Sequence, residues 1–228
     1  MHNFTPALPL PHFMQAPLKH RLSGQTFWLS AQRCIFWEEQ KALIISDLHL
    51  GKTGHFRKAG IAVPQSVYKE DLQRLLHLVL DFKAEHLIVV GDLFHSVANK
   101  ELELFMRWRA DFEHLKITLV KGNHDILKRE WYDTVNIEVI EKTLVLENFA
   151  FTHDQCDAEA GTYSFCGHIH PGVVLNGLGK QTLRFPCFYF TPDHCILPAF
   201  GKFTGLANIR PLKQDTVFAI AEDTLIKL

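Results

Sequence analysis

The stretch of sequence that decides the fold is IISDLHLGKTGHFRKAG, residues 44–60. Its aliphatic start is typical of a buried strand, and this strand ends at Asp47 and His49. Burial of a carboxylate and an imidazole costs free energy unless a partner compensates them. Two residues apart on an extended chain, both side chains point to the same side. The pair indicates two ligands aimed at one metal ion, although a capped turn with a solvated histidine also fits it.

The composition is that of an ordinary soluble globular protein. The 228 residues are 47% hydrophobic and 21% charged, which suits one large α/β domain, so we expect a single domain over 1–228. A formal charge of −1 argues against a broad cationic face for duplex nucleic acid. The five cysteines have no CxxC spacing, the N-terminus has no signal peptide pattern, and no apolar run spans a bilayer. We therefore expect a cytoplasmic protein with reduced thiols and no membrane partner.

The first half of the chain alternates apolar strands with amphipathic helices. Strands are expected at 25–29, 33–37, 41–46, 86–92 and 117–125, and helices at 65–82 and 98–113. This order predicts parallel strands covered by helices, with ligand sites beyond the carboxyl ends of the strands. From about residue 135 the strands are closely spaced, which predicts an antiparallel second sheet. Among these strands are 143–152, 173–176, 182–190 and 216–221.

Polar residues follow the end of an apolar segment five times along the chain. They are Asp47 with His49, then Asp92, Asn123 with His124, His153, and His168 with His170. Taken singly, each has an ordinary explanation, because Asp92 and Asn123 follow glycines as turn residues often do, and His153 could be a core histidine. Chance does not explain five apolar segments in succession that each end in such polar residues.

These side chains form a mixed oxygen and nitrogen ligand set without a thiolate, which suits Mn, Fe or Zn. The set exceeds what one ion needs, so we expect two divalent ions that share Asp92. One ion would be held by Asp47, His49 and His170, and the other by Asn123, His153 and His168. Two cations lower the pKa of a bridging water and clamp the oxygens of an in-line displacement at phosphorus. The pattern therefore predicts phosphoester hydrolysis.

Further residues are candidates for catalysis and substrate binding. His124 is left over from the ligand count and could protonate the leaving oxygen, with Asp125 fixing its tautomer. In the loop after the first ligand pair, Lys52, His55, Arg57 and Lys58 concentrate positive charge. The candidates for substrate binding are Lys52, His55 and Arg57, and Arg57 could make a forked contact to a phosphate. An ordinary solvated basic loop explains each of the four about equally well.

In order and spacing, the motifs D-x-H, G-D, G-N-H-D, H and G-H-x-H resemble those of the calcineurin-like metallophosphoesterases. The resemblance implies a four-layer α-β-β-α sandwich, with two mixed sheets flanked by helices, and it agrees with the ligand roles given above. One departure is the sequence THDQCDAEAG at His153, where many members have His-Gly.

A closer likeness covers nearly the whole chain. The stretches SDLHLGKTGHFRKAGIAVP, GDLFHS and CILPAFGKFTG resemble the bacterial ligase-associated DNA damage response endonucleases. That family implies a manganese-dependent phosphodiesterase acting on DNA, in functional association with a DNA ligase and helicase repair system. GDLFH is also similar to a motif of double-strand-break repair nucleases, which makes His95 a second candidate active-site histidine.

We therefore expect a two-metal phosphodiesterase that acts on DNA, on single strands in preference to duplex. A phosphatase or nucleotidase for small phosphoesters is the alternative enzyme. A non-catalytic scaffold of the same fold would be expected to lose ligands or His124, and none is lost. Residues 198–205 are interpreted as a glycine-rich turn between core strands that could also contact substrate.

Overall fold

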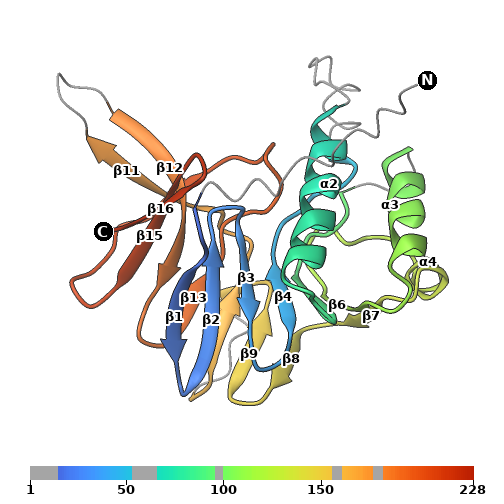
Figure 1. Ribbon diagram of the computed structural model, residues 1–228, viewed down its shortest axis with the longest axis horizontal. Coiled ribbons are helices and arrows are strands. Elements are labelled where there is room, and N and C mark those ends of the chain that lie inside the picture. The colour runs from blue at the N-terminus through green and yellow to red at the C-terminus, as the bar shows by residue number, and fades with distance from the viewer. Residues whose placement is uncertain (1–14, 53–65, 96–99, 156–160, 177–181) are drawn as a thin grey trace, which may run out of the picture.

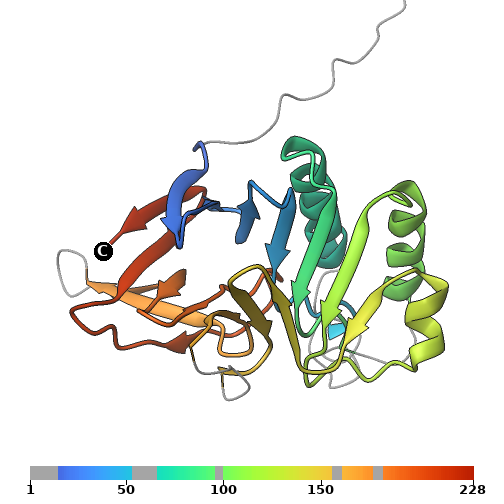
Figure 2. The ribbon, with the colours of Figure 1, turned by 90° about the horizontal axis from the view of Figure 1, so that it is seen from below.

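The computed structural model describes residues 15–52, 66–95, 100–155, 161–176 and 182–228. Within them, two β-sheets pack face to face, and helices cover the outer face of the first sheet (Figures 1 and 2). The prediction of two mixed sheets with helices is confirmed. In the described part of the chain, no helix is long and apolar enough to cross a membrane.

The first sheet comes from the N-terminal part of the chain. In the described residues its seven strands follow chain order. They are β1 Leu18–Leu22, β2 Gln25–Ser30, β3 Cys34–Trp37, β4 Ala42–Ile45, β5 His86–Val90, β6 Lys116–Val120 and β7 Glu138–Ile140. Strands β1 to β4 pair antiparallel and β4 to β7 parallel. The carboxyl ends of β4, β5 and β6 consequently meet at one edge.

Three described helices connect or follow the parallel strands of the first sheet: α2 Ser66–Asp81, α3 Lys100–Asp111 and α4 Arg129–Thr134. Strand β4 shows why they lie on one face, because Leu43 and Ile45 pack toward the helices while Ala42 and Ile44 pack toward the second sheet. Helices α2 and α3 confirm the two predicted helices. Helix α4 was not predicted, because six residues are too few to show a helical period.

The second sheet has nine strands within the described residues. They are β8 Thr143–Leu146, β9 Phe149–Thr152, β10 Tyr163–Cys166, β11 Pro171–Asn176, β12 Thr182–Phe190, β13 His194–Ile196, β14 Ala207–Asn208, β15 Thr216–Ala221 and β16 Thr224–Lys227. Its expected antiparallel pairing was wrong in part, because β9, β10 and β13 run parallel. The single strand expected at 143–152 is a hairpin that turns at Glu147, whose φ is 51°.

Aromatic side chains fill the space between the two sheets. Phe27 of β2 meets Phe149 edge to face at 5.1 Å between centroids, and Phe151 stacks on Phe165 at 5.4 Å. All four are fully buried. Burial of large aromatic surfaces stabilises the packed sheets and fixes their relative position. The loops at the ends of β4, β5, β9 and β10 are thereby held against one another.

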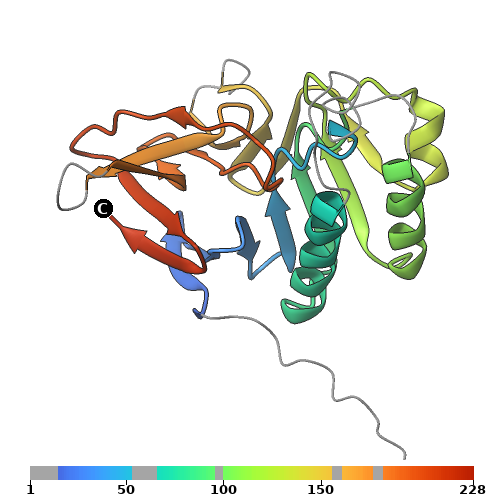
Figure 3. The ribbon, with the colours of Figure 1, turned by 90° about the horizontal axis from the view of Figure 1, so that it is seen from above.

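The outer face of the second sheet differs from that of the first. In the described chain all helices lie against the first sheet (Figure 3). The second sheet instead carries a small apolar cluster of Val173, Cys187, Val217 and Ala219, against which Ile209 packs. The long β11–β12 hairpin projects from this sheet away from the helices (Figure 1).

Candidate metal centre

The backbone of five predicted ligands is left-handed. The φ angles are 53° at Asp47, 52° at His49, 51° at Asp92, 68° at His168 and 52° at His170. Residues other than glycine rarely adopt this conformation, and those that do cluster at functional sites. Strand β4 has already ended before the first of them. The shared direction of the first two side chains therefore comes from tight turns, and not from the alternation of an extended strand.

Backbone hydrogen bonds join the loops that follow β4 and β5. The N–H of Asp47 donates to the carbonyl of Gly91 over 3.1 Å, and the N–H of His49 donates to the carbonyl of Asp92 over 2.9 Å. These bonds continue the pairing of the two parallel strands into their loops. They hold the two carboxylates in fixed positions beside each other.

Hydrogen bonds also connect the two sheets at this edge. The N–H of His168 donates to Oδ2 of Asp47 over 3.1 Å, and the Nδ1–H of His153 donates to the carbonyl of Val90 on β5. Within the second sheet, the N–H of Gly167 donates to the carbonyl of His153 over 3.2 Å. The side chain of Asp47, from the first sheet, thus accepts a bond from the loop after β10. The candidate site exists only where the two sheets meet.

Within the described residues three groups of side chains have the spacing of metal ligands, and two of them overlap at Asp47. The first of these two is Asp47, His49 and His170, and the second is Asp47, Asp92 and His153. In the first group, Nε2 of His170 lies 3.3 Å from Nε2 of His49 and 3.3 Å from Oδ1 of Asp47. Oδ2 of Asp92 lies 3.5 Å from Nε2 of His153 and 3.8 Å from Nε2 of His49. Asp47 belongs to both groups, and Asp92 lies between His153 of the second group and His49 of the first.

The chemistry of these groups fits divalent cations. Asp47 and Asp92 are 0% and 2% exposed, and buried carboxylates so close together require positive charge nearby. Imidazole nitrogens face each other in the pair His49 and His170, and again where Nδ1 of His168 lies 3.3 Å from Nε2 of His153. Two such nitrogens need a proton or a cation between them.

The electrostatic environment differs between two of the histidines. Burial lowers the pKa of His49 to about 3, so its ring is neutral and has a lone pair to give. Burial would also lower the pKa of His153, but the adjacent Asp92 carboxylate raises it to about 9. The Nδ1–H of His153 donates to the carbonyl of Val90 over 3.2 Å, which directs Nε2 toward Asp92. A cation at that point would replace the proton.

Two motif glycines leave room for these side chains, a role that the sequence analysis missed because it treated them as turn signals. A Cβ atom on Gly91 would lie 1.9 Å from Nδ1 of His153. A Cβ atom on Gly122 would lie 2.2 Å from Oδ1 of Asp92. Both contacts are far shorter than atoms allow, so these positions accept no side chain while the histidine and the carboxylate stay in place.

His95 and His124 form a wall beside the first group. Their rings stack at 4.1 Å between centroids with an interplanar angle of 19°. The ring of His49 lies 5.6 Å from that of His95 and 5.4 Å from that of His124, and the nitrogens of all three rings come within 4.8 Å of one another. His124 is exposed, so its ring can meet a molecule that arrives from solvent.

Other predicted residues lie differently. Asp125 is fully buried, and its two oxygens accept the N–H groups of Phe94 and Gly122, each over 2.9 Å. Among the described residues, no contact supports the predicted bond from Asp125 to the His124 ring. The Asp125 carboxylate instead joins the loops after β5 and β6. Asn123 is exposed on the second of these loops.

Of the three predicted substrate-binding residues, only Lys52 falls in the described chain. It is half-buried, and burial lowers its pKa while the charges of Asp47 and Asp92 raise it. This places a cation close to the two carboxylates. His55 and Arg57 lie outside the described residues.

The segment after β13 supports the Asp47 loop from behind. Ser46 and Ala199 form a parallel bridge, the N–H of Phe200 donates to the carbonyl of Ser46 over 2.8 Å, and the N–H of Gly201 donates to the carbonyl of Asp47 over 3.1 Å. Residues 199–201, which belong to the predicted glycine-rich turn, thus pair with the chain that follows β4 of the first sheet. It holds the main chain of Asp47, the first predicted ligand.

Two arginines fix that supporting segment. Nη1 of Arg33 donates to the carbonyls of Ala199 and Gly201 over 3.3 and 3.2 Å. Arg74 donates to the carbonyl of Phe200, lies 4.1 Å from the centre of its ring, and pairs with Asp71 at 3.0 Å. No sequence signal pointed to these arginines, because they lie in the turn before β3 and on α2, far along the chain from the segment that they hold.

Comparison with known proteins agrees with this geometry. The family model of the calcineurin-like phosphoesterases matches residues 41–194, which include every predicted metal ligand. The chain belongs to this family. As a calcineurin-like phosphoesterase it is a metal-dependent phosphoesterase.

Solved structures resemble this phosphoesterase to different degrees. Nuclease MPE of Pseudomonas putida is 31% identical over 93% of this chain and 100% of its own, with a TM-score of 0.80. The phosphoesterase Yfce of E. coli is 15% identical, covers 82% of this chain and 97% of its own, and has a TM-score of 0.45. An archaeal phosphodiesterase is 18% identical over 82% of this chain and 98% of its own, with a TM-score of 0.40. No curated protein matches the sequence.

Proposed function

We propose that this calcineurin-like phosphoesterase is a phosphodiesterase that hydrolyses DNA, with single strands preferred to duplex. The observation that carries the proposal is the stacked pair of His95 and His124 beside the buried carboxylates, on a chain 31% identical to a nuclease. A proton donor next to the reacting phosphate matters most for a poor leaving group such as the alkoxide of a sugar. A formal charge of −1 favours single-stranded DNA, which can be bound through a few local phosphate contacts, over duplex DNA, which needs a broad cationic face.

The proposed ligands divide between two ions that share Asp92. One ion would be held by Asp47, His49 and His170, and the other by Asn123, His153 and His168. Together the ions would activate a water and neutralise charge that develops on the phosphate. Oxygen and nitrogen ligands without a thiolate favour Mn²⁺, with Fe or Zn as alternatives.

The other proposed roles belong to side chains around the ions. His124 would give a proton to the leaving oxygen, and His95, stacked on it, would hold that ring against the phosphate. Asp125 would keep the loop of His124 in place through its two backbone bonds. Lys52, His55 and Arg57 would attract the phosphate backbone toward the ions.

The wider setting is proposed from the sequence resemblance to ligase-associated DNA damage response endonucleases. We place the enzyme in cytoplasmic DNA repair, in association with a DNA ligase and a helicase. The single domain over residues 1–228 remains a prediction, and limited proteolysis of the purified protein would test it.

The deciding experiment compares three substrates with the purified protein in added Mn²⁺: circular single-stranded DNA, linear duplex DNA and nucleoside monophosphates. We expect the single-stranded circle to be cleaved fastest and the monophosphates slowest. The Asp92→Asn variant, purified in the same way, controls for contaminating nucleases. Faster hydrolysis of the monophosphates than of either DNA would replace the proposal with a nucleotidase.

A further inference from the structure

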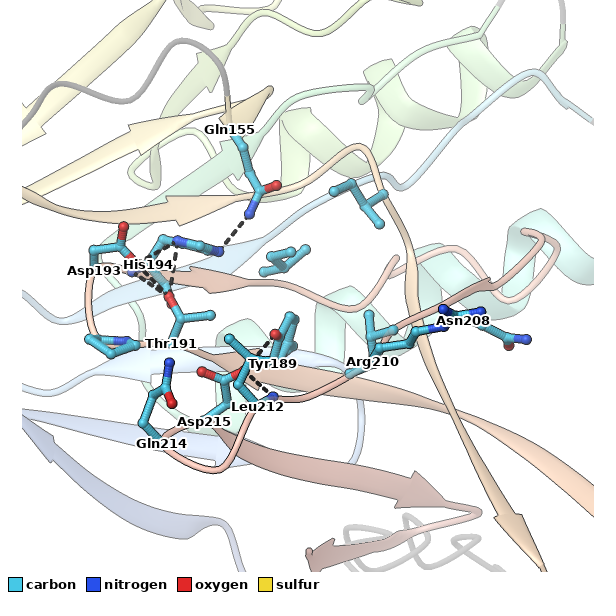
Figure 4. A pocket seen from close by; sticks show the side chains of 14 residues that line it. Gln155, Tyr189, Thr191, Asp193, His194, Asn208, Arg210, Leu212, Gln214 and Asp215 are labelled. Atoms are coloured by element: carbon cyan, nitrogen blue, oxygen red, sulfur yellow. Dashed lines mark hydrogen bonds and ion pairs between the residues drawn. The ribbon is translucent and has the colours of Figure 1, made fainter.

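A hollow of about 500 Å³ lies on the outer face of the second sheet (Figure 4). Its lining comes from the residues after β9 and β10, from β12 and β13, and from the segment 208–215. The volume falls in the range of pockets that bind small ligands or parts of larger ones. No residue proposed for catalysis lines it.

Two segments carry both a proposed ligand and a residue that lines the hollow, and a third segment that lines it is hydrogen-bonded to one of them. Ile169 lines it and stands in the chain between His168 and His170. Gln155 also lines the hollow, two residues after the proposed ligand His153. Asn208 lines it as well, and the N–H of the preceding residue, Ala207, donates to the carbonyl of His170 over 3.0 Å. A strand held by its phosphate at the metal centre would therefore bring a neighbouring nucleotide to this hollow.

The walls combine an apolar floor with a rim of amides. The ring of Tyr189 and the side chains of Ile169, Ile196 and Ile209 supply apolar surface. Three amide side chains stand among the lining residues: Gln155, Asn208 and Gln214. A nucleobase has the complementary form, because its faces stack on aromatic and apolar groups and its edge pairs with the amides of Asn and Gln.

The hollow is formed before any ligand arrives. Oδ2 of Asp215 accepts the hydroxyl of Tyr189 over 2.6 Å and the N–H of Leu212 over 2.7 Å, which ties the segment 212–215 to β12. Burial raises the pKa of Tyr189 to about 12, and the nearby Asp215 charge adds to this effect, so the hydroxyl keeps the proton that it donates. Figure 4 shows this bond across the lower wall.

The opposite wall is also held by hydrogen bonds (Figure 4). Nε2 of His194 lies 2.6 Å from the amide nitrogen of Gln155, and its Nδ1 lies 3.0 Å from Oγ1 of Thr191 and 2.9 Å from Oδ1 of Asp193. A pocket whose walls are fixed in this way loses little conformational entropy when it binds.

Arg210 gives the rim a cation. It is exposed, and among the described lining residues no other is a lysine or an arginine. Its guanidinium could pair with the phosphate that follows a bound base. Lys213 is also exposed in the same segment, but it does not line the hollow.

We propose that this hollow is a subsite for the base of a nucleotide that flanks the scissile phosphate, with Arg210 contacting the phosphate beyond it. The inference rests on the proposed function, because it requires a DNA strand at the metal centre. It adds a recognition element outside the catalytic residues.

The first experiment needs no variant. A set of single-stranded oligonucleotides, each with one abasic position, is cleaved by the wild-type enzyme, and every scissile bond is mapped. Since stacking of a base on an aromatic group strengthens binding of the strand, we expect cleavage to fall about tenfold when one particular flanking position lacks its base. Equal cleavage of all the oligonucleotides would overturn the subsite and leave the nuclease standing.

The second experiment compares Arg210→Ala with Lys213→Ala, because each removes one exposed positive charge from the same segment. Both are assayed on an oligonucleotide and on an activated aryl phosphodiester that has no base. We expect the ratio of DNA to aryl diester cleavage to fall about tenfold in Arg210→Ala, as for a lost charged hydrogen bond, and to stay at the wild-type value in Lys213→Ala.

The outcomes of that comparison are distinct. An equal fall in both variants would mean a general charge effect and no subsite. If the wild-type enzyme and both variants cleave the aryl diester but no DNA, the proposed function is refuted, and the subsite with it.

Discussion

The loops of the first sheet and those of the second meet at the metal centre with different chemistry. The first sheet brings Asp47 and Asp92, which are almost fully buried, and the second brings His153, His168 and His170, of which His168 is exposed. The carboxylates of the first sheet are thus buried, while the imidazoles of the second sheet range from buried at His153 to exposed at His168. The difference teaches that the buried carboxylates of the first sheet require positive charge nearby, and that the second sheet supplies the histidines proposed to complete the coordination of the ions.

The supports of the two sets of loops differ as well. Behind Asp47, the main chain is bonded to the β5 loop on one side and to Gly201 on the other. The loop after β10 bonds to Asp47 through the N–H of His168 on the Asp47 carboxylate, while Gly167 and His170 bond to other parts of the second sheet. We expect changes in the first sheet's loops to have larger effects than changes in the second's.

Replacement of Asp92 should have the largest effect. Asp92→Asn removes the charge that stands between both groups, so we expect loss of both ions and of nearly all activity. The loss of metal affinity should exceed the roughly 10- to 100-fold that follows from loss of a supporting contact. Asn123→Ala, at an exposed position, should weaken one ion only. Metal analysis and calorimetry on both variants measure this, and an active Asp92→Asn enzyme with two ions would refute the shared ligand.

Replacement of His124 should affect chemistry but not metal content. His124→Ala should lower DNA cleavage by about 10² to 10⁴, the usual contribution of a general acid, and spare an activated aryl diester whose phenolate leaves unaided. His95→Ala should weaken DNA cleavage less and keep both ions. Rates on both substrates at fixed Mn²⁺ provide the measurement. If His124→Ala loses both activities equally, the general-acid role is wrong.

A substitution behind the first sheet's loops tests their support. A Cβ atom on Gly201 would lie 2.6 Å from the carbonyl oxygen of Leu48, so Gly201→Ala should push the Asp47 loop and cost about 1–3 kcal/mol of stability. Metal affinity should fall with it. Gly205→Ala is the matched control, because a Cβ atom there meets nothing within 4 Å. Thermal unfolding and metal titration of the two variants provide the measurement. If both variants have the same stability and metal affinity, the segment at Gly201 does not support the Asp47 loop.

The smallest effect is expected from the thiols. Cys166 is buried beside the second sheet's ligand loop, and burial raises its pKa to about 12. Alkylation of the native protein near neutral pH should therefore leave Cys166 unmodified and activity unchanged, since the thiolate is the reacting form. Mass spectrometry before and after denaturation gives the modified sites. Modification of Cys166 in the native protein with loss of activity would show that this loop opens.

Local sequence patterns predicted much of the fold and the residues of the candidate site. Apolar runs located β5 and β6, helical spacing located α2 and α3, and the polar residues at strand ends marked side chains that the structure brings together. The parallel pairing of β10 with β13 could not be predicted, because both strands are short and their neighbours are distant in the chain.

Other features depend on contacts that no local pattern records. The left-handed turns at Asp47 and His49 are imposed by bonds to the β5 loop, although the sequence there reads as a continuing strand. The pairing of Ser46 with Ala199 depends on the packing of the two sheets. Asp125 was expected beside the His124 ring because it follows it in sequence, but burial directs its carboxylate to backbone amides.

The support of Asp47 by Gly201 has a consequence for the order in which the enzyme is made. Chains are synthesised from the N-terminus, and contacts between distant residues form only after both partners exist. A growing polypeptide contains Asp47 and Asp92 early, but it lacks His168 and His170 until the second sheet is under way, and the Ala199–Gly201 brace later still. With the proposed ligands, hydrolytic capacity would therefore be absent during translation, and a ribosome that stalls before residue 168 would release a fragment without the complete set of proposed metal ligands.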